Sequence, residues 1–133
     1  MKQADYEDQL FKQIVESGTL PVPDRQYKAL GKKRRFTWDF AWEDKGLLVE
    51  VQGGTWVPGG MGHTSGAGYR RDCFKNDLAV ASGWKVMSFT SDMVTYGEAL
   101  QFIKVFFRQA DLDTVISMFK VRTRRNKKET KDG

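Results

Sequence analysis

The sequence has few of the residue types that form disulfides or bind soft metals. Its 133 residues include one cysteine, Cys73, and one histidine, His63. A single cysteine excludes an internal disulfide, and one cysteine with one histidine is too few for a Cys/His zinc site. Catalysis by a Ser/His/Asp or Cys/His arrangement would have to use His63. If the protein is an enzyme, carboxylates are therefore the remaining candidates for its catalytic groups.

Long apolar runs are also missing. No stretch approaches the roughly 18 residues of a membrane span, so we expect no membrane partner. The first eight residues are polar and contain no apolar signal core, from which we expect a cytoplasmic rather than a secreted protein. Positive charge is in excess, with 22 Lys and Arg against 17 Asp and Glu and a formal net charge of +5. This excess favours a polyanionic partner.

Hydrophobic periodicity predicts an α/β protein with one domain at residues 1–120 and a basic flexible tail at 121–133. The predicted elements are, in chain order, a helix at 4–17, a short strand at 26–30, strands at 36–42 and 47–52, a helix at 69–82, a strand at 84–89, and helices near 97–109 and 112–119. The helix at 69–82 is expected to turn Phe74, Leu78 and Ala81 inward. The strands at 36–42 and 47–52 should form an antiparallel hairpin, because the four residues between them are too few for a crossover.

This hairpin predicts a pair of carboxylates. A four-residue turn at 43–46 pairs Trp42 with Leu47 and, further along, Asp39 with Glu50. Directly opposed side chains have Cβ atoms roughly 4.5–5.5 Å apart, so two carboxylates there repel each other unless a cation or a proton lies between them. Oxygen ligands on a sheet suit a hard divalent cation, Mg²⁺ or Mn²⁺. Two alternatives stay open: a solvated face of the hairpin, and a register shifted by one residue, which would put the carboxylates on opposite faces.

Asp39, ten intervening residues and then Glu50-Val51-Gln52 resemble the motif of the PD-(D/E)xK nuclease superfamily, in a variant with glutamine in place of the usual lysine. The predicted order of helix, three strands, helix and strand, over about residues 4–90, is similar to the core of that family. The resemblance implies a restriction-endonuclease-like αβββαβ core with a mixed central sheet flanked by helices, plus C-terminal helices. It also implies Mg²⁺ or Mn²⁺ bound by Asp39, Glu50 and the Val51 carbonyl.

The resemblance further implies catalytic roles for Glu7, Gln52 and Lys75 beside Asp39 and Glu50. Glu7 is similar to the acidic residue that the first helix supplies in several members, with Asp8 as its rival. A lysine at the third motif position would hold the attacking water and offset phosphate charge, whereas Gln52 can do only the first. Some members carry that lysine on the following helix, where Lys75 is the candidate. The alternative for Lys75 is an ordinary solvated helix lysine, which would leave a weak or degenerate nuclease.

The function implied by the resemblance is that of a metal-dependent, structure-selective DNA endonuclease that hydrolyses phosphodiester bonds. Its most specific version is a Holliday junction resolvase that acts as a homodimer on branched or duplex DNA, in the cytoplasm of a bacterium or a phage-infected host cell. Two alternatives stay open. One is a nicking, repair-type or restriction-type endonuclease on the same fold, and the other is a DNA-binding protein with a catalytically impaired site.

Three clusters of basic residues accompany the carboxylates. They are Lys33, Arg34 and Arg35; Arg70 and Arg71; and Arg124 and Arg125. Each cluster alone is typical of a solvated surface, but three in one small basic protein predict binding to DNA phosphates. His63, in a glycine-rich segment at 53–68, is a further candidate for phosphate contact. That segment matches neither of the glycine-rich nucleotide-binding motifs, so we expect no nucleotide cofactor.

Overall fold

The computed structural model of the protein describes the backbone of residues 2–52 and 66–132, and the side chains of these residues up to Arg124. The elements are, in order, α1 (Gln3–Ser17), β1 (Asp24–Tyr27), β2 (Trp38–Trp42), the 3₁₀ turn η1 (Glu43–Lys45), β3 (Leu47–Gln52), α2 (Gly66–Ala81), β4 (Lys85–Thr90), α3 (Ser91–Thr95), α4 (Glu98–Phe106) and α5 (Leu112–Asp132). None of the helices in this described part of the chain is long and apolar enough to cross a membrane.

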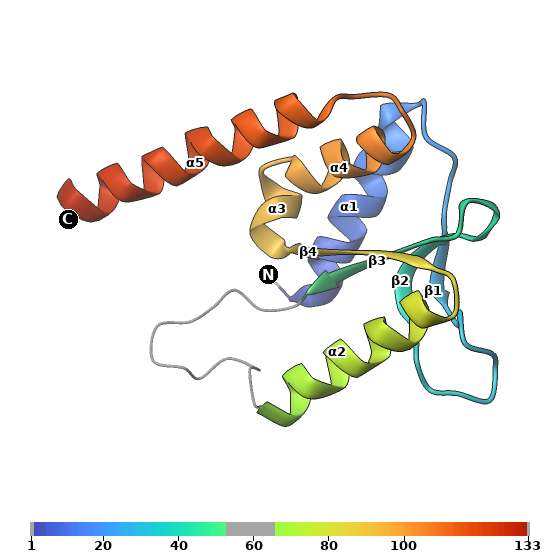
Figure 1. The fold of residues 1–133 in the computed structure, drawn as a ribbon. Helices are drawn as coiled ribbons and strands as arrows, with labels where there is room; N and C mark the ends of the chain where they lie inside the picture. Colours follow the sequence, from blue (N-terminus) through green and yellow to red (C-terminus); the bar gives the residue numbers. More distant parts are fainter. Residues whose placement is uncertain (1, 53–65, 133) are drawn as a thin grey trace.

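The strands form one mixed sheet in the order β1-β2-β3-β4 (Figure 1). β1 and β3 both run antiparallel to β2, and β4 runs parallel to β3. The hairpin pairs Trp42 with Leu47 and Phe40 with Val49, so the predicted register is confirmed along the paired part of β2 and β3. The turn closes through Gly46, whose φ of +65° lies in the left-handed region that glycine adopts without strain. The predicted α/β class and mixed sheet are confirmed.

Helices cover both faces of the sheet, and each face has its own apolar cluster. Figure 1 shows α2 on one face and α1, α3 and α4 on the other, with α5 packed outside α4. The cluster beside α1 includes Phe40, Trp42 and Val49. The cluster beside α2 includes Trp38 and Leu48. The sheet is therefore the middle layer, and a side chain on β3 reaches either α1 or α2 according to its position in the alternation.

β2 reverses its faces at Asp39. In a regular strand, residues two apart lie on one face, but Trp38 packs in the α2-side cluster while Phe40 packs in the α1-side cluster. β1 reverses at the same level: Arg25 stacks over the Phe40 ring, whereas Tyr27 packs edge-on against Trp84. Between Arg25 and Tyr27, Gln26 has a φ of +50°. The side chains of β1 and β2 therefore change faces at the level of Gln26 and Asp39, where the candidate site lies.

The face that α2 turns toward the sheet differs from the prediction. Phe74, expected to face inward, is 58% exposed. Lys75 and Ala79 are buried instead. These two residues are four apart and share one side of the helix. The hydrophobic pattern is misleading here because α2 presents a lysine to the sheet where an amphipathic helix presents an apolar side chain.

Two further predictions about the elements are wrong in extent. The short strand expected at 26–30 is displaced, since β1 lies at Asp24–Tyr27. The last helix, expected to end near 119, continues as α5 to Asp132. The domain limit at residue 120 and the flexibility of the segment after it stay predictions. Lysine, arginine and glutamate are good helix formers, so a charged sequence with no apolar periodicity can still continue a helix.

Candidate active site

Asp39 lies where β2 and β3 separate. The paired part of the two strands ends at Phe40 and Val49, one residue short of Asp39 and Glu50. Beyond that point the Asp39 side chain takes the place of a backbone carbonyl, because its Oδ2 accepts the Val51 backbone N–H at 2.7 Å. Asp39 is 8% exposed. The carboxylate is therefore fixed in the seam between the strands instead of standing on one face of the hairpin opposite Glu50, as the sequence predicted.

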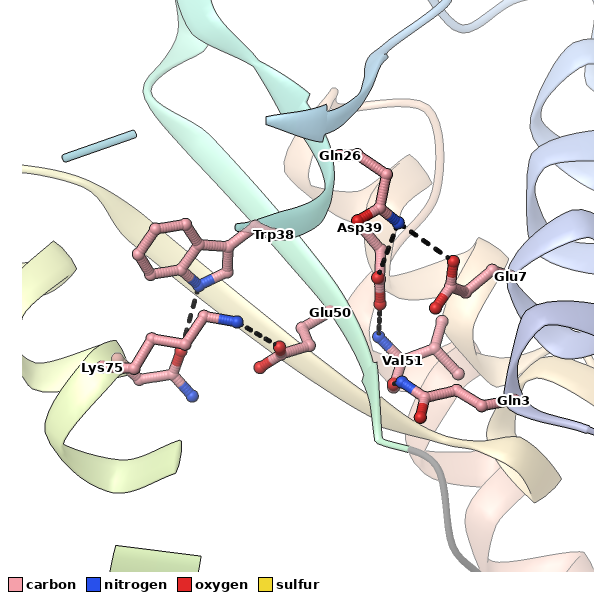
Figure 2. Close-up of polar contacts among 9 residues, drawn as sticks. Gln3, Glu7, Gln26, Trp38, Asp39, Glu50, Val51 and Lys75 are labelled. Carbon is pink, nitrogen blue, oxygen red and sulfur yellow. Dashed lines mark hydrogen bonds and ion pairs between the residues drawn. The ribbon is translucent and has the colours of Figure 1, made fainter. Parts of the chain in front are cut away.

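Glu7 reaches Asp39 from the α1 side of the sheet (Figure 2). The Gln26 side-chain amide donates to both carboxylates, at 3.2 Å to Glu7 Oε2 and 3.3 Å to Asp39 Oδ1. Burial, together with the hydrogen bond to Asp39 and its negative charge, raises the pKa of Glu7 from 4.5 to about 7. A proton therefore relieves the repulsion of this pair near neutral pH. Asp8, the predicted rival of Glu7, pairs with Arg25 at 2.7 Å instead.

Glu50 and Lys75 form an ion pair on the α2 side of the sheet. Lys75 Nζ lies 2.5 Å from Glu50 Oε1, and the two side chains are only 10% and 14% exposed. The ammonium group also lies 4.7 Å from the centre of the Trp38 ring, an attractive position for a cation. Glu50 Oε2 is buried and has no hydrogen-bond partner in the described part of the chain. Lys75 is therefore not a solvated helix lysine.

Burial is the main cause that raises the pKa of Glu50 above its ordinary value. The neighbouring Lys75 opposes this shift, while the charge of Asp39 adds to it. Glu50 and Asp39 thus interact electrostatically even though their carboxylates point to different sides, Glu50 toward α2 and Asp39 into the seam (Figure 2). The sequence argument requires a cation or a proton near these carboxylates, and the structure has both. The Lys75 ammonium group pairs with Glu50, and Glu7, with its raised pKa, can carry a proton beside Asp39.

Two side-chain amides complete the site, and neither was predicted. Gln26 joins Glu7 to Asp39, and Gln3 Nε2 donates to the Val51 carbonyl oxygen at 2.9 Å. Gln3 lies four residues before Glu7 and so shares its side of α1, a spacing that could have identified it. No sequence pattern marks Gln26, because the reversal of β1 that directs it is visible only in three dimensions.

The donor atoms of this site are oxygens, the type that a hard divalent cation prefers. Asp39, Glu50 and the Val51 carbonyl offer oxygen atoms from adjacent strands, and Glu50 Oε2 is buried with its hydrogen-bonding capacity unused. Within the described residues, however, no three His, Cys, Asp or Glu side chains are gathered closely enough to hold a metal ion. Cation binding would therefore use the backbone carbonyl as a third ligand, in competition with Gln3. Gln52, the last residue of β3, pairs with Thr90 of β4 at the same end of the sheet.

Two of the predicted basic clusters meet beside Lys75. Arg35, from the connection between β1 and β2, and Arg71, from α2, line a cavity of about 330 Å³ together with Lys75. Arg71 stacks over the ring of Phe36, 5.7 Å from its centre, which holds the guanidinium in place. The other predicted phosphate-binding residues that the structure describes, Lys33, Arg34, Arg70 and Arg124, are exposed. His63 and the side chain of Arg125 lie outside the described residues.

No protein-family model matches the chain, and no curated protein or solved structure matches it either. The chemistry of the site is therefore the basis on which a function can be argued.

Proposed function

We propose that the protein is a metal-dependent DNA endonuclease that hydrolyses phosphodiester bonds, with a restriction-endonuclease-like core and a Holliday junction as its most specific substrate. The observation that carries the proposal is the Glu50 carboxylate. It is buried, one of its oxygens is bound to Lys75, the other has no partner in the described chain, and it lies next to Asp39 across the strand seam. A buried carboxylate with unused capacity beside a second carboxylate is typical of a functional site rather than of a stable core.

The fold supports this proposal through the order and pairing of its elements. A helix, three antiparallel strands, a helix and a parallel strand follow one another from α1 to β4. The resemblance to PD-(D/E)xK nucleases depends on this order. In the same arrangement Asp39 and Glu50 come from neighbouring strands, and Lys75 comes from the helix after them, the position to which some members move the missing motif lysine.

Asp39, Glu50 and the Val51 carbonyl would hold Mg²⁺ or Mn²⁺. The ion would polarise a phosphate and lower the pKa of a bound water. Lys75 supplies positive charge at Glu50 Oε1, and it lines the same cavity as Arg35 and Arg71. There it can offset the charge of a phosphate group. Gln52, at the end of β3, can orient a water molecule by hydrogen bonding but adds no charge.

Cleavage of a four-way junction and of its matched linear duplex tests the proposal. We expect paired nicks on the junction in Mg²⁺, abolished by EDTA and by Glu50→Ala. Asp44→Asn is the matched control, because Asp44 is an exposed acid in the turn at the other end of the hairpin, and it should cut like the wild type. Equal cutting of both substrates would instead indicate a general endonuclease. A stable dimer in solution would favour paired cuts over single nicks.

The second candidate is a DNA-binding protein with an impaired site. The observation that favours it is that two of the proposed metal ligands already have partners, since Lys75 binds one oxygen of Glu50 and Gln3 binds the Val51 carbonyl. Tight binding of the junction with no cleavage in either Mg²⁺ or Mn²⁺ would select this candidate and reject the first.

A further inference from the structure

Gln26 combines an unusual backbone conformation with an unusual pair of contacts. Its φ of +50° lies in the left-handed region, which a residue with a Cβ atom adopts at a cost. Its side-chain amide lies between two carboxylates from different elements, Glu7 on α1 and Asp39 on β2. Strain of this kind persists where the surrounding structure enforces it, and it is concentrated at functional sites.

The backbone conformation and the contacts have one geometric cause. Arg25 is held on the α1 side by its stacking on Phe11 and its ion pair with Asp8. Tyr27 is held on the α2 side by its contact with Trp84. The chain reverses its faces between them, at Gln26, and this reversal directs the Gln26 amide toward the seam where Asp39 lies (Figure 2).

Asp39 is thereby held at both of its oxygens. Oδ2 accepts the Val51 backbone N–H, and Oδ1 accepts the Gln26 amide. Removal of the Gln26 amide would leave the carboxylate held by the Val51 N–H and by its hydrogen bond with Glu7, and the second of these is lost when Glu7 ionises. A ligand that is held less firmly binds a metal ion more weakly, and loss of such an outer partner typically lowers metal affinity about 10–100-fold.

We propose that Gln26 is a positioning residue, held in a strained conformation so that its amide fixes the Asp39 carboxylate, beside Glu7, for a divalent cation bound at Asp39. This inference rests on the proposed metal-dependent function, but it assigns a role to a residue that does not itself bind the metal. It requires that replacement of Gln26 by glycine weaken cation binding without lowering the stability of the fold.

Three variants separate positioning from stability. Gln26→Gly removes both the amide and the strain. Gln26→Met keeps the side-chain length and the strain but has no amide. Arg108→Gly is the matched control, because Arg108 is the other residue with a side chain at positive φ in the described chain, φ +60°, and it lies in the connection between α4 and α5. Mn²⁺ affinity is measured by the electron paramagnetic resonance of free Mn²⁺, and the unfolding temperature of the metal-free protein is measured by calorimetry.

Both Gln26 variants should bind Mn²⁺ at least about 10-fold more weakly than the wild type, and Arg108→Gly should bind it equally. Relief of the strain should raise the unfolding temperature of Arg108→Gly by about 2–4 °C, and that of Gln26→Gly should be no lower than the wild type, whereas Gln26→Met should gain nothing. Wild-type affinity in Gln26→Gly, or a Gln26→Gly less stable than Gln26→Met, would overturn this inference alone. A wild-type protein that binds no Mn²⁺ would overturn the metal-dependent function and this inference together.

Discussion

Replacement of Lys75 with methionine should destabilise the protein far more at neutral than at acidic pH. The substitution keeps the length of the side chain and removes the charge that Glu50 faces at 2.5 Å. Removal of one partner of a buried ion pair costs about 3–5 kcal/mol when the remaining charge cannot be relieved. Here it can be relieved, because Glu50 can take up a proton, and burial already raises the pKa of its carboxyl.

Protonation sets an upper limit on the cost. Keeping a proton at pH 7.5 on a carboxyl with an ordinary pKa of 4.5 costs about 4 kcal/mol, and at pH 5.5 it costs about 1.4 kcal/mol. The folded variant binds more protons than its unfolded chain between these values, so its stability must fall as pH rises. We expect Lys75→Met to lose about 3 kcal/mol at pH 7.5 and about 1 kcal/mol at pH 5.5 relative to the wild type.

Urea unfolding followed by tryptophan fluorescence at the two pH values measures these losses. Lys12→Met is the control, since Lys12 faces Glu16 in an exposed ion pair at 3.9 Å, and it should change stability by less than about 0.5 kcal/mol at either pH. The double variant Lys75→Met with Glu50→Gln should recover most of the stability lost at pH 7.5. A loss that is the same at both pH values would refute the reasoning. It would show that the variant loses stability through altered packing and not through the unpaired charge of Glu50.

Three more predictions follow from other contacts. The wild type should lose stability as pH rises from about 5 to 8, because the pKa of Glu7 is about 7 in the folded protein and 4.5 when unfolded, and Glu7→Gln should reduce this dependence in urea titrations; identical pH profiles would contradict it. Arg122→Met leaves Glu98, whose side chain is 3% exposed, without its cation, and should lower the free energy of unfolding in urea by about 3 kcal/mol. A loss below about 1 kcal/mol would show that Glu98 becomes solvated or protonated at little expense. Arg71→Gln should lower the slope of log Kd against log salt for DNA by about 1, and an unchanged slope would remove Arg71 from the phosphate contacts.

The parts of the site that sequence can predict depend on local geometry. A four-residue turn fixes the register of the hairpin, and strand alternation fixes which residues of β3 share a face, so the sequence alone is enough to assign Asp39 and Glu50 to neighbouring strands. Lys75 is a candidate on similar grounds, because its distance along the chain places it on the helix after the strands.

The parts that sequence missed depend on contacts between distant elements. Asp39 points into the strand seam because β1 and β2 reverse their faces together, and this reversal is set by Arg25 and Tyr27 packing against opposite layers. The face that α2 turns toward the sheet was missed for a related reason. Phe74 has the larger apolar surface, but the ion pair of Lys75 with Glu50 brings the neighbouring side of the helix against the sheet. A hydrophobicity pattern contains no information about a buried charge partner.

The reversal in β1 also bears on how the sheet ends. β1 is an edge strand, and a regular edge presents a row of unpaired backbone groups to which a strand of another molecule can add. A strand only four residues long that changes face at Gln26 offers no continuous row, since its N–H and C=O groups do not keep one direction. The feature that directs an amide toward Asp39 therefore also protects this edge against intermolecular strand addition. A Gln26→Val variant, whose β-branched side chain favours a regular strand, is expected to aggregate more readily.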